Sequence, residues 1–492
     1  MMKSIVCPIA KAASETPDRP ALIDASTSLG YKQLDSAVEA AVANLRGLGI
    51  KSRDVVAILD SNSIPYAILF YAAFRMGFVL MPLNTRLNQS DWRRQLNMAD
   101  CRLVIYGDKF KNGIGKLDIE AILIDKIIST DSANSHIPDL HESEIDRPAL
   151  IIFGSGTAGE FRGVILTWKN LYYSALGIES VLSYKPDDRW LAVLPFFHIG
   201  GISIPFRTVL AGCGTRIMTR FNPKEVIEAV EREQVHYLSV VPTMLRDLIR
   251  DDHHESLKRL KAIIVGGAAF DKPLQEEAGA RALPILTTYG MTETASMVTL
   301  QSMTDIGKNV QTSGLALPYR KLKIADEAGR QLPSGEIGRI KVRGEVLFSN
   351  YLNQKGAPVD SDGWFDTGDI GRLDNDNHLI ITGRADRVII SGGENIDLAH
   401  IEEILGAVEG ITGAVVIPRP SARWGERPVA FVETSSGRIT ENGIKETLQN
   451  KLPSLMIPDR IIIVDNLPLT GSGKYDQKSL QEKYSSIFEI DG

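Results

Sequence analysis

The glycine-rich segment at residues 154–163, GSGTAGEFRG, has the composition of a loop that binds phosphate. It follows a strand-like apolar run at 149–153, and its first six positions include three glycines, one serine and one threonine. Glycine lets the main chain approach an anion closely, and Arg162 adds a charge suited to phosphate oxygens. The Gly-Lys-Ser/Thr of a Walker A loop does not follow. The segment therefore predicts phosphate binding, with a flexible turn between strands as the alternative.

Four later segments carry further polar and glycine-rich patterns: YGMTETAS at 289–296, DGWFDTGDIG at 362–371, GRADRVIISGGENIDLAHIE at 383–402 and LPLTGSGKYD at 467–476. In this order, together with the phosphate-type segment, they resemble the adenylate-forming superfamily of acyl-CoA synthetases, luciferases and peptide-synthetase adenylation domains. The resemblance covers essentially the whole chain. It implies an ATP-consuming enzyme that activates a carboxylic acid as an acyl-adenylate.

The resemblance implies phosphate and metal contacts in the first two motifs. Joining a carboxylate to the α-phosphate of ATP brings two negative groups together, so the site must supply cations and aligned donors. Thr292 would contact the α-phosphate, and Glu293 would help bind Mg²⁺, which prefers oxygen ligands; a helix cap is the alternative for this pair. The other residues implied at the phosphates are Ser155, Gly156, Thr157, Gly159 and Arg162.

The nucleoside contacts are also implied by resemblance. Asp369 would accept hydrogen bonds from the ribose hydroxyls, and Arg384 would be the second ribose contact. Tyr289 is expected on one face of the adenine, and Gly267, within Gly-Gly-Ala at 266–268, on the other. An aspartate after a glycine is often only a turn residue, and this alternative applies to Asp369.

The last two motifs imply a second half-reaction with coenzyme A. Lys474, in a glycine-flanked loop, would bridge the carboxylate and the phosphate as a catalytic residue during adenylation. The small C-terminal domain would then rotate about Asp386, because hinge residues absorb large changes in φ and ψ. Gly392 and Gly393 would line the channel for the pantetheine arm.

The segment LPFFHIGGISIPFR at 194–207, with SGGENI at 391–396 and RWGERPVAFV at 423–432, resembles the o-succinylbenzoate–CoA ligase branch, which serves menaquinone synthesis. That acid is an aromatic keto acid with two carboxylates. We expect His198 and Arg207 to help bind it, with Arg207 near the non-reacting carboxylate, directly or through water. Alternatively, His198 packs against the phenylalanines before it and Arg207 pairs with an acid elsewhere.

Other activities remain open from the sequence: a CoA ligase for another aromatic or medium-chain acid, a stand-alone adenylation enzyme that loads a carrier protein, or a relative that only binds nucleotide. The last rests on a departure in the phosphate-type segment, where Glu160-Phe161-Arg162 replaces the common Pro-Lys pair. Arginine keeps the charge but not the compact ammonium. Asp397-Leu398 and His400 also depart from the pattern of the superfamily.

The elements that must position these residues alternate between helix and strand in the first part of the chain, which predicts an α/β fold with parallel-type sheets. Short strands with turns predict a β-rich subdomain after residue 335. We expect a large domain at 1–385 and a small mobile α+β lid domain at 386–492, because 492 residues exceed one core. The expected helices lie at 34–48, 66–76, 224–233, 398–408 and 444–451, and the expected strands at 54–59, 79–81, 190–194, 262–265, 338–343, 363–367, 378–382, 414–417 and 429–432.

Composition excludes several classes of protein. The net charge is -6, so no basic footprint for nucleic acid is present. Three widely spaced cysteines favour a reducing compartment over a disulfide scaffold, and the apolar run at 66–83, interrupted by Arg75, favours a buried helix and strand over a membrane span. We expect a cytoplasmic protein with a small-molecule acid as its partner. If the chain forms oligomers, a homodimer is the commonest arrangement.

Overall fold

The computed structural model describes residues 3–115, 117–129, 142–155, 161–268, 270–307, 312–391, 394–435, 439–449, 451–469 and 475–488. For Ser155 and Asp386 only the main chain is described. Six residues predicted for the site lie outside the described residues: Gly156, Thr157, Gly159, Gly392, Gly393 and Lys474.

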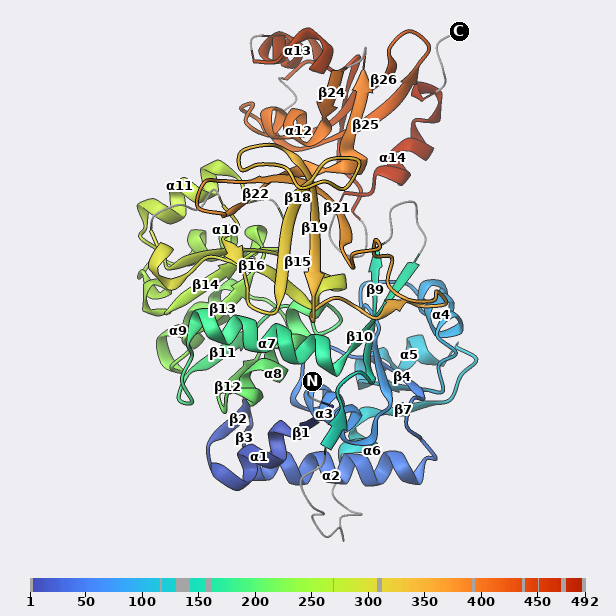
Figure 1. Cartoon of the computed structure of the whole chain (residues 1–492), viewed down its shortest axis with the longest axis vertical. Coiled ribbons are helices and arrows are strands. Elements are labelled where there is room, and N and C mark those ends of the chain that lie inside the picture. Colours follow the sequence, from blue (N-terminus) through green and yellow to red (C-terminus); the bar gives the residue numbers. More distant parts are fainter. Residues whose placement is uncertain are drawn as a thin grey trace.

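A seven-stranded sheet forms one half of the large N-terminal part (Figure 1). Its strands, in spatial order, are β20 (Asn350–Tyr351), β10 (Phe161–Thr167), β9 (Pro148–Ser155), β5 (Val79–Pro82), β4 (Val55–Leu59), β6 (Leu103–Tyr106) and β7 (Ala121–Leu123). The sheet is parallel from β9 to β7, whereas β10 is antiparallel to both of its neighbours, β9 and β20. The helices of this half are α2 (Tyr31–Gly47), α3 (Ile64–Met76), α4 (Gln89–Met98), α5 (Lys111–Ile114) and α6 (Ile124–Ile128).

A nine-stranded sheet forms the second half. Its spatial order is β17 (Leu315–Ala316), β16 (Ser296–Leu300), β15 (Ile285–Met291), β14 (Ala262–Val265), β13 (Tyr237–Val240), β11 (Arg189–Ala192), β12 (Gly214–Ile217), β2 (Pro20–Ile23) and β3 (Ser28–Gly30). Strands β15 to β2 are parallel. In β14, Ile264 faces one core and Ile263 the other, so this parallel sheet is buried on both faces.

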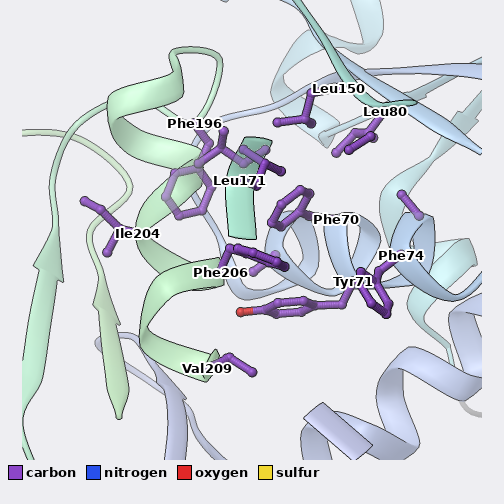
Figure 2. Close-up of a cluster of buried hydrophobic side chains, with 14 of the residues drawn as sticks. Phe70, Tyr71, Phe74, Leu80, Leu150, Leu171, Phe196, Ile204, Phe206 and Val209 are labelled. Carbon is purple, nitrogen blue, oxygen red and sulfur yellow. The ribbon is translucent and has the colours of Figure 1, made fainter. Parts of the chain in front are cut away.

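Helices cover both faces of the nine-stranded sheet: α7 (Trp168–Leu182) and α8 (Ile199–Leu210) on one side, and α9 (Pro223–Arg232), α10 (Pro242–Asp251) and α11 (Lys272–Ala280) on the other. Figure 2 shows Phe70 of α3 beside Phe206 of α8, at a ring separation of 6.0 Å. Helix α3 is apolar on nearly all sides because it lies inside this core. Its Arg75 pairs with Asp35 and Glu39 of α2. The expected buried helix and strand at 66–83 are confirmed.

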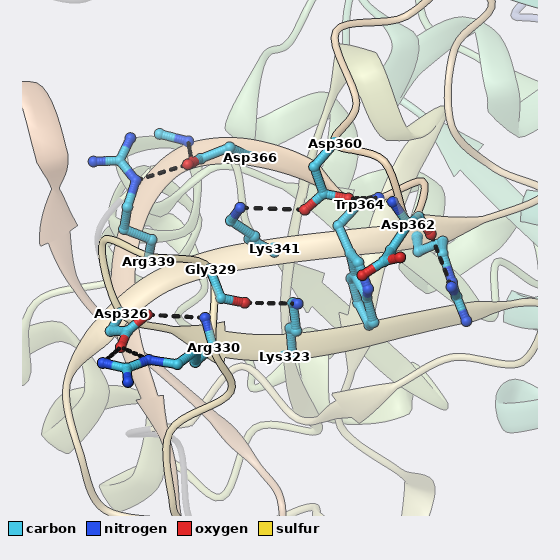
Figure 3. A network of polar contacts seen from close by, with 12 residues as sticks. Lys323, Asp326, Gly329, Arg330, Arg339, Lys341, Asp360, Asp362, Trp364 and Asp366 are labelled. Atoms are coloured by element: carbon cyan, nitrogen blue, oxygen red, sulfur yellow. Dashed lines mark hydrogen bonds and ion pairs between the residues drawn. The ribbon is translucent and has the colours of Figure 1, made fainter.

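A four-stranded antiparallel sheet follows, in the order β18 (Arg320–Ala325), β19 (Gly338–Gly344), β21 (Phe365–Leu373) and β22 (Leu379–Arg384). Polar contacts run along it in Figure 3, where Lys341 lies 3.4 Å from Asp360 and Arg339 lies 2.7 Å from Asp366. The Lys341–Asp360 contact holds the loop before β21 against the sheet, and the Arg339–Asp366 contact joins β19 to β21. The expected strand at 363–367 was too short, because β21 stays paired with β22 as far as Leu373.

The C-terminal part has its own sheet, β24 (Glu394–Asp397), β23 (Val388–Ser391), β26 (Gly425–Thr434) and β25 (Ile411–Ser421), with β27 (Arg460–Val464) parallel to β26. Its helices are α12 (Leu398–Gly406), α13 (Glu441–Gln449) and α14 (Gln477–Lys483). A separate apolar cluster lies between α12, α13 and this sheet. The mixed α/β class is therefore confirmed. The predicted boundary at 385/386 falls in the short 3-10 helix Ala385–Arg387 between two sheets, and it stays a prediction.

A two-stranded sheet and a short helix complete the description of the N-terminal part: strand β1 (Ser4–Val6) pairs with β8 (Glu142–Glu144), and helix α1 is Pro8–Glu15. Within the described ranges, no helix is both long and apolar enough to cross a membrane.

Candidate active site

The two ends of the glycine-rich segment belong to strands that pair with each other. This corrects the expectation of a loop over the whole of 154–163. Strand β9 continues to Ser155 and β10 begins at Phe161, with Arg162 opposite Gly154 in the antiparallel register. Arg162 therefore stands on a strand rather than on a free loop. Its guanidinium lies over the ring of Tyr351, 5.8 Å from the ring centroid. A strand is a more rigid support for a phosphate contact than a turn would be.

The predicted residues of the nine-stranded sheet follow the carboxyl ends of its parallel strands. His198 comes after β11, Gly267 after β14, and the Thr292–Thr294 3-10 helix directly after β15. Carboxyl ends of parallel strands meet at one edge, which is where open α/β sheets bind ligands. The topology therefore brings these residues to the same edge of the sheet.

The turn after β14 needs its glycines. A Cβ on Gly266 would lie 2.9 Å from the main-chain oxygen of Thr288 on β15, and Gly267 has φ of +80°. The first residue therefore allows close packing on the neighbouring strand, and the second adopts the left-handed conformation that favours glycine. The predicted adenine contact of Gly267 stays a prediction.

Asp369 lies between two of the other predicted residues. The hydroxyl of Tyr289 donates a hydrogen bond of 2.6 Å to its Oδ2, and Nη1 of Arg384 lies 3.1 Å from its Oδ1. Asp369 and Arg384 are also paired residues of β21 and β22. Asp369 is thus a strand residue, so the turn alternative is wrong. The three side chains come from two sheets and form one polar cluster.

Tyr289 has a second environment that the sequence did not indicate. Its ring packs in an apolar cluster with Val298, Ile324 and Ile340, and only 7% of the residue is exposed. Burial and the charge of Asp369 raise the pKa of Tyr289 well above its usual value. The hydroxyl therefore stays protonated at neutral pH and remains a donor to the carboxylate. Its adenine contact stays a prediction.

Glu293 is held by a residue that the sequence analysis missed. Oε1 of Glu293 accepts a hydrogen bond of 3.0 Å from the hydroxyl of Tyr351. The helix-cap alternative for Thr292 and Glu293 is not supported, because the hydroxyl of Thr294 accepts the N–H of Met291 instead, at 3.1 Å. No local pattern marks Tyr351, since its role depends on pairing between β10 and β20.

The side chains of the described residues form no cluster of three or more metal-ligand types. A closed, all-protein cage of the zinc or calcium kind is therefore not formed by these residues. A single carboxylate such as Glu293 fits Mg²⁺ that is held mainly by substrate phosphates and water, which is the usual mode for this ion.

The two residues predicted to bind the acid differ in exposure. His198 is half-buried at the start of α8, and its ring lies 4.6 Å from that of Phe197. Arg207, on the same helix, is only 1% exposed; it donates to the Oγ of Ser203 at 2.5 Å and lies over the ring of Trp190 at 4.8 Å. The alternative packing role of His198 therefore agrees with its contact, which leaves its ligand contact a prediction.

Arg207 is a buried cation without an acidic partner among the described residues. Its Nη1 has no hydrogen-bond partner there, and burial lowers its pKa to about 10, so it stays charged at neutral pH. The alternative that Arg207 pairs with an acid elsewhere finds no support in the described part of the chain. A buried charge that lacks a counterion is costly, and an anionic ligand would reduce that cost.

An α/β architecture with predicted site residues at the carboxyl edge of a parallel sheet, a polar cluster around Asp369 and a C-terminal part with its own sheet agrees with the class of adenylate-forming enzymes. The family profile described as AMP-binding enzyme matches residues 9–352, and that of the AMP-binding enzyme C-terminal domain matches residues 400–474. The chain therefore belongs to the family of AMP-binding enzymes.

Similar proteins carry more specific names. The chain is 33% identical to the 2-succinylbenzoate–CoA ligase of Listeria monocytogenes, over 96% of this chain and 97% of the relative. It is 31% identical to the ligase of the same name from Enterococcus faecalis, over 98% and 99%. The o-succinylbenzoate CoA synthetase of Bacillus subtilis, solved with the acyl-adenylate intermediate OSB-AMP, superposes with a TM-score of 0.91, at 28% identity and with 98% and 99% coverage. The same enzyme solved with ATP and magnesium gives 0.90, at 28% identity and with 97% and 100% coverage.

Proposed function

We propose that this protein is an AMP-forming acid–CoA ligase that acts on o-succinylbenzoate, as in menaquinone biosynthesis. The observation that carries the choice of acid is the similarity over nearly the full chain to ligases named for this acid. Arg207, which has no acidic partner among the described residues, is the candidate contact for a second carboxylate of the acid.

In the first half-reaction, a carboxylate oxygen of the acid attacks the α-phosphorus of ATP. The bond from that phosphorus to the bridging oxygen breaks, and pyrophosphate leaves with the bond electrons. Asp369 and Arg384 hold the ribose, while Arg162 offsets charge on the phosphates. Glu293 would hold Mg²⁺, which supplies charge neutralisation at the phosphate oxygens. Thr292, Ser155, Gly156, Thr157 and Gly159 are the further proposed phosphate contacts.

In the second half-reaction, the thiol sulfur of coenzyme A attacks the acyl carbonyl, its proton is released, and AMP leaves. Lys474 serves the first step, and Gly392 with Gly393 serves the second. Rotation of residues 386–492 about Asp386 would replace the face of this domain that carries Lys474 by the face that carries Gly392 and Gly393. The location of Asp386 in the 3-10 helix between two sheets supports this role, because hinge residues commonly lie in loops or at the ends of elements, where they absorb changes of main-chain angle.

His198 and Arg207 are the proposed contacts to the acid. The phenyl ring of the acid suits the apolar side of the α8 N-terminus, where Phe197 already contacts His198. The guanidinium of Arg207 would attract the non-reacting carboxylate, directly or through an ordered water. Such a contact separates a dicarboxylic acid from simple aromatic or aliphatic acids.

The test is a panel of acids assayed for pyrophosphate release without CoA and for thioester with CoA. We expect o-succinylbenzoate to have the highest kcat/KM in both assays. A higher value for benzoate or octanoate would overturn the choice of acid and leave the ligase class intact. Pyrophosphate release without any thioester on free CoA would instead indicate an enzyme that loads a carrier protein.

A further inference from the structure

Tyr351 lies between two site residues that come from different sheets. It ends β20, opposite Val164 of β10, and Arg162 stands two residues before Val164 on the same strand. A long side chain can reach such a diagonal neighbour across an antiparallel pair. The guanidinium of Arg162 accordingly lies over the Tyr351 ring, while the Tyr351 hydroxyl donates to Glu293.

Glu293 is held at a second point by the same short segment. The main-chain N–H of Phe348 donates to the main-chain oxygen of Glu293 at 2.9 Å. The ring of Phe348 packs on that of Tyr351 at 4.7 Å and on that of Phe365 at 5.3 Å. Residues 348–351 therefore fix both the main chain and the carboxylate of Glu293, and packing restricts the Tyr351 ring to this position.

We propose that Tyr351 is a positioning residue, which aims the Glu293 carboxylate at the metal and the Arg162 guanidinium at the phosphates. This inference rests on the proposed function. Oε1 accepts the tyrosine hydroxyl, which leaves Oε2 and the second lone pair of Oε1 for the ion. Mg²⁺ requires a near-ideal octahedral geometry, which makes the direction of a single protein carboxylate important. Partners that orient a ligand are typically worth about 10–100-fold in metal affinity or activity.

The same geometry gives a physical role to the arginine at position 162. A planar guanidinium can lie on an aromatic face and still present N–H donors to phosphate oxygens, whereas an ammonium offers a point charge. Tyr351 thus contacts the cation that faces the phosphates and the anion that faces the metal. Loss of its hydroxyl should disturb the metal side, and loss of its ring should disturb both.

The experiment measures ATP binding by titration calorimetry at a series of free Mg²⁺ concentrations, and Mn²⁺ binding in the presence of ATP by electron paramagnetic resonance. Tyr351→Phe removes the hydroxyl and keeps the ring. We expect it to raise the Mg²⁺ concentration for half-maximal ATP binding by about 10-fold and to leave ATP affinity in EDTA unchanged. Tyr172→Phe on α7 is the matched control and should leave both unchanged.

A comparison with Glu293→Gln tests the coupling. If Tyr351 acts through Glu293, Glu293→Gln shifts the Mg²⁺ dependence strongly in the wild type and much less in Tyr351→Phe. Glu293→Asp leaves Tyr351 intact, shortens the carboxylate and should reproduce the metal defect. Melting temperatures of all variants establish that they are folded.

Two results overturn the inference and differ from failure of the proposed function. Wild-type Mg²⁺ dependence in folded Tyr351→Phe, together with a clear shift in Glu293→Gln, shows that Tyr351 does not position the ligand. If Glu293→Gln has the Mg²⁺ dependence of the wild type, Glu293 does not hold the metal, and the inference loses its basis. Failure of the wild-type protein to bind ATP at all would instead contradict the proposed function itself.

Discussion

The hydroxyl of Tyr289 lies 2.6 Å from Oδ2 of Asp369, a residue 80 positions further along the chain. Arg384 contacts the other carboxylate oxygen, so both oxygens have a defined direction. A carboxylate that is held in this way can accept from a sugar hydroxyl with little reorganisation. The contact thus links the nine-stranded sheet to the four-stranded sheet at the proposed ribose site.

Tyr289→Phe should weaken ATP binding. The hydrogen bond has a charged acceptor, and such bonds contribute about 1.5–3 kcal/mol, which corresponds to about a 10- to 100-fold rise in the KM for ATP. The KM for the acid should not change. Asp369→Asn is the companion variant, and a defect there with normal kinetics in Tyr289→Phe would show that the tyrosine does not position the carboxylate.

Arg207→Met should change the KM for acids that carry a second carboxylate and not the KM for acids that lack it. The variant replaces a buried cation by an apolar chain, so the melting temperature should be kept or raised. The KM for o-succinylbenzoate should rise by at least about tenfold, because a buried charge contact is lost. An analogue with hydrogen in place of the non-reacting carboxylate should keep its KM.

A matched control for that variant is Arg320→Met. Arg320 is also buried, but its hydrogen bonds go to the main-chain oxygens of Met297, Tyr173 and Pro318. This variant should lower stability and leave acid preference unchanged. Equal KM changes for both acids in Arg207→Met would mean that Arg207 supports the fold and does not bind the second carboxylate.

Lys474→Ala should slow adenylation by about 10²–10³-fold, if its charge acts mainly in the transition state. Rapid-quench measurement of pyrophosphate release gives this rate. Thioester formation from added acyl-adenylate should proceed at the wild-type rate. Lys474 lies outside the described residues; the described residues on either side of 470–474, Leu469 and Tyr475, form an antiparallel bridge. A normal adenylation rate would exclude the assigned role.

Asp386→Pro should have the opposite kinetic pattern. Proline restricts φ at the proposed hinge, so rotation of residues 386–492 becomes harder while the first orientation is retained. Single-turnover assays should show slow thioester formation with normal adenylation. If both half-reactions fall equally, the hinge lies elsewhere.

The stability of the C-terminal domain should depend on the protonation of Glu402. Burial raises the pKa of this carboxyl above its usual value, although Arg387 lies 2.5 Å away and opposes the rise. Between the unfolded and the native pKa, the native state binds the extra proton, so stability decreases as pH rises.

Glu402→Gln cannot titrate and serves as the reference for that pH dependence. Urea unfolding from about pH 4 to about pH 7.5 should give a stability advantage of the wild type that is largest at the acid end and declines as pH rises. An advantage that grows with pH would mean that the charge of Arg387 outweighs burial.

Local patterns in the sequence predicted much of the fold. The strand expected at 262–265 is β14 exactly as bounded, and the helix expected at 34–48 is α2 at Tyr31–Gly47. The periodicity and number of apolar residues predict such elements, because a helix or strand of this kind depends mainly on neighbours within a few residues. Strand bounds that depend on pairing with distant residues were predicted less well. β10 begins at Phe161 and β21 runs to Leu373, because partner strands from other parts of the chain supply their hydrogen bonds.

The residue motifs themselves determined the class of chemistry, since phosphate, metal and carboxylate contacts require particular side chains that can be recognised in the sequence. The tertiary structure decided which of them meet. Tyr289 reaches Asp369, and Tyr351 reaches Glu293 across 58 positions, only because separate sheets are packed together. It also decided that Arg207 is buried with no acidic partner among the described residues, because the environment of a side chain depends on long-range packing rather than on its neighbours in the sequence.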